Sequence, residues 1–213
     1  MHKIHHIKCK TDNCYIAESG DNAILVDTAS GEGYTAVLEE CKKYNIRLIV
    51  LTHVHFDHAE NAAKLSKELG VPVAFNKADE ELFDDYKAQA LMSYGLVGRV
   101  VLGVSLKVLS ETEVKKPENI MYISEGDDLS SYGIDARIIS FPGHTKGSIG
   151  VDVEGESLLV GDALDNWISP ATGHLYSNIE DLKNSAEKIR SLGERTLYYG
   201  HGKPTPNKFK MLK

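Results

Sequence analysis

The 213-residue sequence has few cysteines and no excess of basic residues. Its three cysteines, Cys9, Cys14 and Cys41, are odd in number and lack the paired spacing of a cysteine-based metal site. We therefore expect no disulfide framework, and a reducing cytoplasmic environment. The formal net charge of −7 weighs against a protein that binds nucleic acid by neutralising phosphates.

Long uninterrupted apolar runs are also missing. Polar residues rather than an apolar segment follow Met1, so no secretory signal is indicated. The most apolar stretch, 91–109, contains Arg99 and Lys107, and a basic residue in mid-membrane costs about 2.5–3.5 kcal/mol. We expect no membrane span. With 18 glycines and 6 prolines the composition is globular, and the length suits a single domain over residues 1–213.

Short apolar runs alternate with helical patterns along most of the chain. Buried strands are predicted at 23–27, 48–52, 71–75, 121–123, 136–140, 149–153, 157–160 and 196–199. Helices are predicted at 33–45, 59–69 and 179–192. Strands covered by helices on their outer faces indicate an α/β layered domain.

Residues 79–117 break this alternation. Apolar residues recur at helical spacing from Tyr94 to Val108, which predicts a helical insertion on the α/β core. Its apolar face fits a lid or wall beside a binding site. It fits ordinary core packing or the contact of a homodimer equally well.

The stretch 52–58, THVHFDH, concentrates metal-binding side chains directly after a predicted strand. Imidazole nitrogens and carboxylate oxygens are ligands that Zn²⁺ and related ions accept. His53 and His55 are two positions apart in an extended segment, so both side chains point to one side. Asp57 and His58 then begin the next helix. A surface turn that happens to be rich in histidine is the weaker interpretation.

Three further candidates also follow predicted strands. His144 lies in FPGHTKGS, Asp162 in VGDA and His201 in YGHG. Ligand sites in layered α/β folds gather at the carboxyl ends of strands, and an adjacent glycine allows close approach of the backbone. Each residue taken alone is more often structural. Together with segment 52–58 they indicate one site that contains five of the nine histidines.

The motifs HxHxDH, PGHTxGS, GD and GHG, in this order, resemble the metallo-β-lactamase superfamily over about residues 11–205. The resemblance implies an αββα sandwich and two metal ions. It implies that the first ion is held by His53, His55 and His144, the second by Asp57, His58 and His201, with Asp162 as the bridge. Asp27 matches a family acid that supports the metal loop, and a turn acid at a strand end is the alternative.

The resemblance further implies hydrolysis by metal-activated hydroxide, with zinc as the first choice of metal and iron or manganese as alternatives. Asp57 is the candidate to orient the attacking water and carry its proton. His174 and Lys146 are candidate substrate-binding residues. Asp162 separates the sequence from true β-lactamases, which lack a bridging carboxylate.

The pattern is closer to glyoxalase II-like hydrolases, which favours a small ester, thioester or lactone as substrate. Typical glyoxalase II has a helical extension after its last metal ligand. Only a dozen residues follow His201, so we expect a short relative.

Alternative functions stay open. A mononuclear iron enzyme that oxidises persulfides uses a similar ligand set and is the first alternative. A phosphodiesterase or nuclease shares the motif, although the acidic charge weighs against it. A non-catalytic protein that retains its metal ions is the alternative that agrees least with a complete set of ligands. We expect a small-molecule substrate and no nucleic-acid partner.

Overall fold

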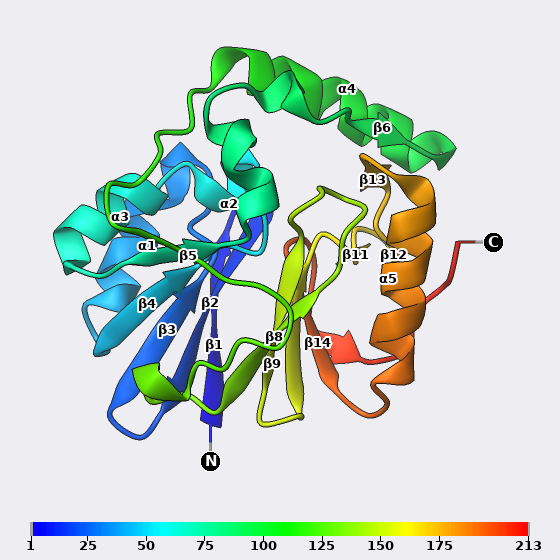
Figure 1. Cartoon of the computed structure of the whole chain (residues 1–213). Helices are drawn as coiled ribbons and strands as arrows, with labels where there is room; N and C mark the ends of the chain where they lie inside the picture. Colours follow the sequence, from blue (N-terminus) through cyan, green and yellow to red (C-terminus); the bar gives the residue numbers. More distant parts are fainter. Residues whose placement is uncertain (1, 213) are drawn as a thin grey trace.

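The computed structural model describes residues 2–212 and has two mixed β-sheets packed face to face between layers of helices (Figure 1). The first sheet has the order β1-β2-β3-β4-β5-β7 and the second the order β15-β14-β10-β9-β8. The first sheet comprises β1 (His2–Cys9), β2 (Asp12–Ser19), β3 (Asn22–Val26), β4 (Ile46–Val50), β5 (Val73–Phe75) and β7 (Ile120–Tyr122). The second comprises β8 (Ala136–Ser140), β9 (Ile149–Val153), β10 (Ser157–Gly161), β14 (Thr196–Tyr199) and β15 (Thr205–Pro206). The αββα sandwich is thereby confirmed.

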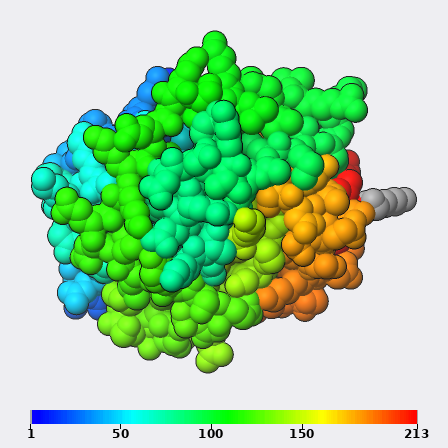
Figure 2. Space-filling model, turned by 45° about the horizontal axis from the view of Figure 1, so that its top comes forward, coloured from blue at the N-terminus to red at the C-terminus, as the bar shows by residue number. Residues whose placement is uncertain are grey.

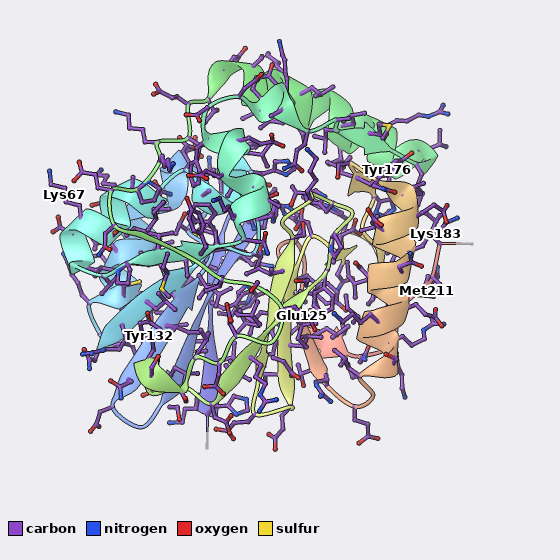
Figure 3. All side chains as sticks on the ribbon, viewed as in Figure 1. Lys67, Glu125, Tyr132, Tyr176, Lys183 and Met211 are labelled. Carbon is purple, nitrogen blue, oxygen red and sulfur yellow. The ribbon has the colours of Figure 1, made fainter. Side chains whose placement is uncertain are left out.

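Helices cover the outer face of each sheet. The first sheet is covered by α1 (Tyr34–Cys41), α2 (Phe56–Ala59) and α3 (Ala62–Leu69), and the second by α5 (Ile179–Ser191). Lys67 on α3 and Lys183 on α5 point outward from these two layers (Figure 3). No helix within residues 2–212 is long and apolar enough to cross a membrane.

Strand β3 is apolar from Ala23 to Val26 because it is buried on both faces. Ala23 and Leu25 pack toward the helices, whereas Ile24 and Val26 pack into the core between the sheets. Successive side chains of a strand point to opposite faces, so a strand buried on both faces needs a continuous apolar run. In β4 Leu48 likewise faces the other sheet, whereas Arg47 is exposed.

The carboxyl ends of five strands meet at one edge of the sandwich. Strands β3 and β4 are parallel, and β10 is parallel to β14. Strands β8 and β10 are both antiparallel to β9 and therefore run in the same direction. The backbone N–H of Ile149 donates to the carbonyl of Thr52 at 2.8 Å and joins the two sheets at this edge.

The sequence-based elements agree with the structure apart from their ends. The helix expected at 59–69 is divided, because Phe56–Ala59 forms the separate helix α2 before α3 begins. The helix expected at 33–45 ends at Cys41 and follows a short 3₁₀ helix, η1 (Gly31–Gly33). Strands β1 and β2 had no counterpart in the sequence analysis.

The insertion expected at 79–117 is largely helical. It contains most of η2 (Lys77–Phe83), then η3 (Tyr86–Ala88), β6 (Met92–Ser93) and α4 (Gly95–Glu111). Helix α4 crosses above the edge at which the two sheets meet (Figure 1). The short strand β6, absent from the sequence-based expectation, pairs with β13 (Leu175–Tyr176) and ties the insertion to the second half of the chain. A second short pair joins β11 (Leu164–Asp165) to β12 (Ala171–Thr172).

Candidate metal centre and its pocket

The candidate ligands all lie at the edge where the five strands end. Segment 52–58 follows β4, His144 follows β8, Asp162 follows β10 and His201 follows β14. The positions expected from the sequence are therefore brought together. Their donor atoms form three overlapping groups in which all atoms lie within 4.8 Å of one another. These groups are His53–His55–His144, His53–His58–Asp162 and Asp57–His58–His201.

The first group is made only of imidazoles. Nε2 of His144 lies 2.9 Å from Nδ1 of His55 and 3.2 Å from Nε2 of His53. All three residues are buried. Three ring nitrogens turned toward one point can supply three of the four ligands of a tetrahedral metal site.

The group of Asp57, His58 and His201, together with Asp162, carries the negative charge. Nε2 of His201 lies 3.2 Å from Asp57 Oδ2 and 3.3 Å from Asp162 Oδ2. The other Asp162 oxygen lies 3.5 Å from Nε2 of His58, and Asp162 Oδ2 is also 3.8 Å from His144. Asp162 therefore faces His144 of the imidazole group as well as His58 and His201 of the group that contains Asp57.

Hydrogen bonds away from the cluster orient the rings. His144 Nδ1 donates to the carbonyl of Leu175 at 3.0 Å, and His201 Nδ1 donates to the carbonyl of Thr11 at 2.9 Å. A proton held at Nδ1 leaves a lone pair on Nε2 for a metal ion. The tautomer of each ring thus follows from its partner outside the cluster.

Electrostatics divide the cluster into two halves. Burial and the neighbouring His144 lower the pKa of His55 to about 3, so its ring stays neutral. Burial opposes the charged form of His58, but the carboxylates of Asp27, Asp162 and Asp57 raise its pKa to about 9. Carboxylates likewise hold the pKa of His201 well above its ordinary value despite burial. The half of the cluster that contains Asp57 and Asp162 attracts positive charge, and a divalent cation can supply that charge.

Two buried atoms test whether the cluster fits metal ions. Nε2 of His58 and Oδ1 of Asp162 are buried, and neither has a hydrogen-bond partner within the described residues. An unpaired buried polar atom costs about 1–3 kcal/mol. Both atoms lie beside other nitrogen and oxygen atoms that also carry lone pairs. Cations placed between these atoms would therefore satisfy all of them. The residues present fit a pair of divalent cations.

Gly200 makes room for this arrangement. A Cβ atom at this position would collide with the carboxylate of Asp162 and lie 2.5 Å from Cε1 of His58. The GHG motif therefore has a steric reason: the chain beside His201 passes directly behind two other candidate ligands.

Asp27 lies behind the metal loop. Its carboxylate accepts hydrogen bonds from the backbone N–H of Thr52 at 2.8 Å and from Nδ1 of His58 at 2.8 Å. The residue has a φ of 62°, a left-handed conformation that aspartate and asparagine tolerate better than most side chains. These hydrogen bonds connect Asp27 to the loop between β4 and α2 and to α2 itself.

We expect Asp27→Asn to weaken metal binding by about 10-fold or more, since loss of a partner behind a ligating histidine typically costs 10–100-fold. Asparagine keeps the backbone conformation but cannot accept both bonds as a carboxylate. Competition with a chelating dye measures the affinity. Asp21→Asn, on an exposed turn, is the control. Equal affinities for the two variants would contradict the supporting role.

Asp79 is a buried carboxylate that sequence reasoning missed as a site residue. Its oxygens accept from the backbone N–H of Val54 at 3.2 Å and of Gly147 at 2.7 Å, and from the hydroxyl of Thr145 at 2.7 Å. Gln89 Nε2 donates to it at 3.1 Å. Asp79 therefore joins the loop of His53 and His55 to that of His144. A lone acid in a helical segment has no sequence signal for this role.

Asp79→Asn is expected to lower the free energy of unfolding by about 2–3 kcal/mol, because its amide group would face donors and leave them unpaired. For a chain of this length that corresponds to roughly 4–12 °C in Tm, measured by calorimetry. The exposed neighbour Asp84, changed to asparagine, is the control. A Tm that changes equally in both variants would show that Asp79 does not join the loops.

A pocket of about 380 Å³ opens beside the cluster. His55, Asp57, His144, Asp162 and His201 line one end of it. Residues of helix α4 also line this pocket, so the insertion borders the candidate site.

The two candidate substrate-binding residues have different surroundings. His174 lines the pocket, donates from Nδ1 to Asp165 Oδ2 at 2.6 Å and stacks on the ring of Tyr94. The hydrogen bond to Asp165 raises the pKa of His174. Lys146 lies outside the pocket lining, and its ammonium pairs with the exposed Glu81 at 2.8 Å. Trp167, which the sequence analysis did not single out, lines the pocket and stacks on His201 with ring centroids 4.4 Å apart.

Comparison with known proteins identifies the family. Residues 9–201 match the family model of the metallo-beta-lactamase superfamily, and the chain belongs to that superfamily. The pattern of imidazole and carboxylate groups described above is consistent with the divalent metals of this class. A probable metallo-hydrolase of Methanocaldococcus jannaschii is 29% identical over 196 residues, which cover 86% of this chain and 84% of the relative.

A second relative is hydroxyacylglutathione hydrolase 1 of Vibrio vulnificus, 26% identical over 200 residues. The match covers 93% of this chain but only 65% of that protein. Among solved structures, a metallo-beta-lactamase family protein from Thermus thermophilus aligns with a TM-score of 0.72 at 22% identity, covering 97% of this chain and 75% of the other. TTHA1623 in a di-iron-bound form aligns with a TM-score of 0.68 at 24% identity, covering 96% and 94%. These structural matches support the fold.

Proposed function

We propose that this chain is a dinuclear metal-dependent hydrolase of a small ester, thioester or lactone. The observation that carries the proposal is the convergence of five imidazoles and two carboxylates at one end of a pocket. Neither carboxylate of this cluster pairs with a lysine or arginine in the ion pairs of residues 2–212, so the histidines and a cation balance their charge.

The three groups of donors support the following set of ligands. His53, His55 and His144 would hold one ion, Asp57, His58 and His201 the other, and Asp162 faces both. Such ions supply Lewis acidity that polarises a carbonyl group and lowers the pKa of a water molecule. Zinc suits a site rich in imidazole, and iron suits the same donors.

Asp57 has the position of a proton carrier. Its carboxylate lines the pocket and lies 3.2 Å from His201. Burial alone would raise the pKa of Asp57, but His58 and His201 lower it to about 2, which keeps the carboxylate ionised at neutral pH. An ionised oxygen that faces the pocket can orient the attacking water and accept its proton.

His174 supplies a polar group on the pocket wall. Asp165 accepts a hydrogen bond from Nδ1, which leaves Nε2 of the neutral ring to accept a hydrogen bond from a hydroxyl or N–H group of the substrate. The proposal gives Lys146 no part in the pocket. A substrate-binding role for it would need a molecule that reaches the surface near Glu81.

The relatives support the reaction class. The probable metallo-hydrolase of M. jannaschii covers most of both chains, and the hydroxyacylglutathione hydrolase of V. vulnificus acts, by its name, on a thioester. Both relatives are distant, so they support hydrolysis as the class of reaction rather than a particular substrate.

Elemental analysis of protein purified without added metal, followed by a substrate panel, tests the proposal. We expect two ions per chain and turnover of at least one ester, thioester or lactone, with less activity on β-lactams and phosphodiesters. Oxygen uptake with glutathione persulfide, together with a single iron per chain, would instead establish the oxidative alternative. Metal-loaded protein that cleaves only phosphodiesters would also overturn the proposal.

A further inference from the structure

The pocket has an apolar wall that hydrolysis itself does not require. Helix α4 contributes Val100, Val101, Val104, Val108 and Leu109 to the lining. The candidate metal donors line the same pocket. Figure 2 shows the insertion, in green, spread over this face of the molecule. Apolar walls favour ligands that bury aliphatic surface.

The pocket also lacks a permanently charged basic side chain. Within residues 2–212, histidine is the one basic residue type that lines it, and no lysine or arginine does. Apart from the metal donors, its acids are Asp12 and Asp165, and both have partners. Asp12 Oδ2 accepts from the hydroxyl of Ser30 at 2.7 Å, and Asp165 accepts from His174 at 2.6 Å. A carboxylate of a substrate placed against the valines of α4 would lose water without gaining a lysine or arginine partner.

Apolar side chains continue from the wall to the mouth of the pocket. Val100 is 70% exposed and Val104 is 62% exposed, although both line the pocket. Trp167, on the loop between β11 and β12, is 37% exposed and lines the same cavity. An apolar chain that leaves the metal donors therefore meets further apolar surface as it approaches solvent.

We infer that the substrate carries an uncharged aliphatic chain next to the scissile bond, and that this chain lies along α4. The kind of bond that is cleaved rests on the proposed function, whereas the aliphatic chain of the substrate is inferred from the lining of the pocket. Burial of each methylene group favours binding by a factor of about three to four. The specificity constant should therefore rise by about that factor per methylene until the chain fills the pocket.

Two series of uncharged esters test this, one lengthened in the acyl chain from acetyl to octanoyl and one in the alkoxy chain. We expect kcat/KM to rise about threefold to fourfold per methylene in at least one series. An acyl chain of equal length that ends in a carboxylate should be cleaved at least about tenfold less well, since no lysine or arginine of α4 lines the pocket. A flat profile in both series would overturn the inference.

A matched pair of variants locates the chain. Val101→Phe narrows the pocket and should lower kcat/KM for the longest ester at least about tenfold more than for the shortest. Leu96→Phe makes a similar change on the exposed side of the same helix, outside the pocket lining, and should leave the profile unchanged. If a second copy of the chain covered these valines instead, Val101→Phe would alter the oligomeric state without altering the profile, which would also overturn the inference.

Binding of alkyl hydroxamates to the metal-loaded protein separates the two proposals. Their head group binds metal ions, so calorimetry can measure affinity against chain length even if no ester is cleaved. Affinity that rises with chain length, without turnover of any ester, thioester or lactone, would support the aliphatic site and reject the hydrolase. Turnover with no chain-length dependence in rate or affinity would reject the aliphatic site and leave the hydrolase standing.

Discussion

Asp162→Ala should release at least one metal ion per chain and lower kcat by at least about a thousandfold, equivalent to about 4 kcal/mol in activation free energy. Asp162 is the carboxylate that faces both groups of donors, at 3.8 Å from His144 in one group and at 3.5 Å from His58 and 3.3 Å from His201 in the other. Alanine removes both oxygens and leaves His58 and His201 with one carboxylate, Asp57, on the pocket side. Elemental analysis and a turnover assay on the best substrate of the panel measure the two effects.

A control for Asp162→Ala is Asp135→Ala, an exposed acid of the same sheet region that lies away from the cluster. It should keep both ions and full activity. Two ions bound to the Asp162 variant would show that this carboxylate is not the bridge. A variant that loses metal but keeps its rate would separate the second ion from catalysis.

Removal of the metal should lower Tm by roughly 8–16 °C. An ion present at about 1,000 times its dissociation constant stabilises the native state by about 4.1 kcal/mol. For a chain of this size each kcal/mol shifts Tm by about 2–4 °C. Without cations the structure buries Asp162 and His58 with unpaired atoms, so the apo protein carries an added cost. Calorimetry before and after dialysis against a chelator measures the shift.

Restoring zinc should restore Tm, whereas restoring calcium should not, because imidazole donors suit zinc and calcium prefers oxygen ligands. The Asp162→Ala variant provides a second control, since its Tm should respond less to the chelator. An unchanged Tm after complete removal of metal would show that the cluster is structurally stable without cations.

The strand pattern of the chain was accessible from sequence because most strands are buried on both faces. Ala136–Ser140, Ile149–Val153 and Thr196–Tyr199 appear in the structure with the predicted bounds. Strand β1, with polar residues at several positions and only partial burial, gives a weak periodic signal. The division between α2 and α3 depends on the turn at Glu60 and Asn61, which periodicity does not report.

The position of the insertion was the main feature that the sequence left open. A helix was expected from the spacing of Tyr94 to Val108, and α4 occupies most of that stretch. Its location depends on contacts with a distant segment. Gly98 allows the carbonyl of His174 to approach within 3.0 Å of the place where a Cβ would lie, and β6 pairs with β13. Such contacts join residues about 80 positions apart and have no local pattern.

The sequence by itself determined the donor types, the order of the motifs and their attachment to strand ends, because ligand chemistry and strand periodicity are local properties. Only the tertiary structure decided that the insertion forms an apolar wall and that Asp79 joins two metal loops. It also decided which ring nitrogen faces the cluster. These features depend on side chains from opposite sheets meeting at one edge, and that meeting is set by the packing of the whole sandwich.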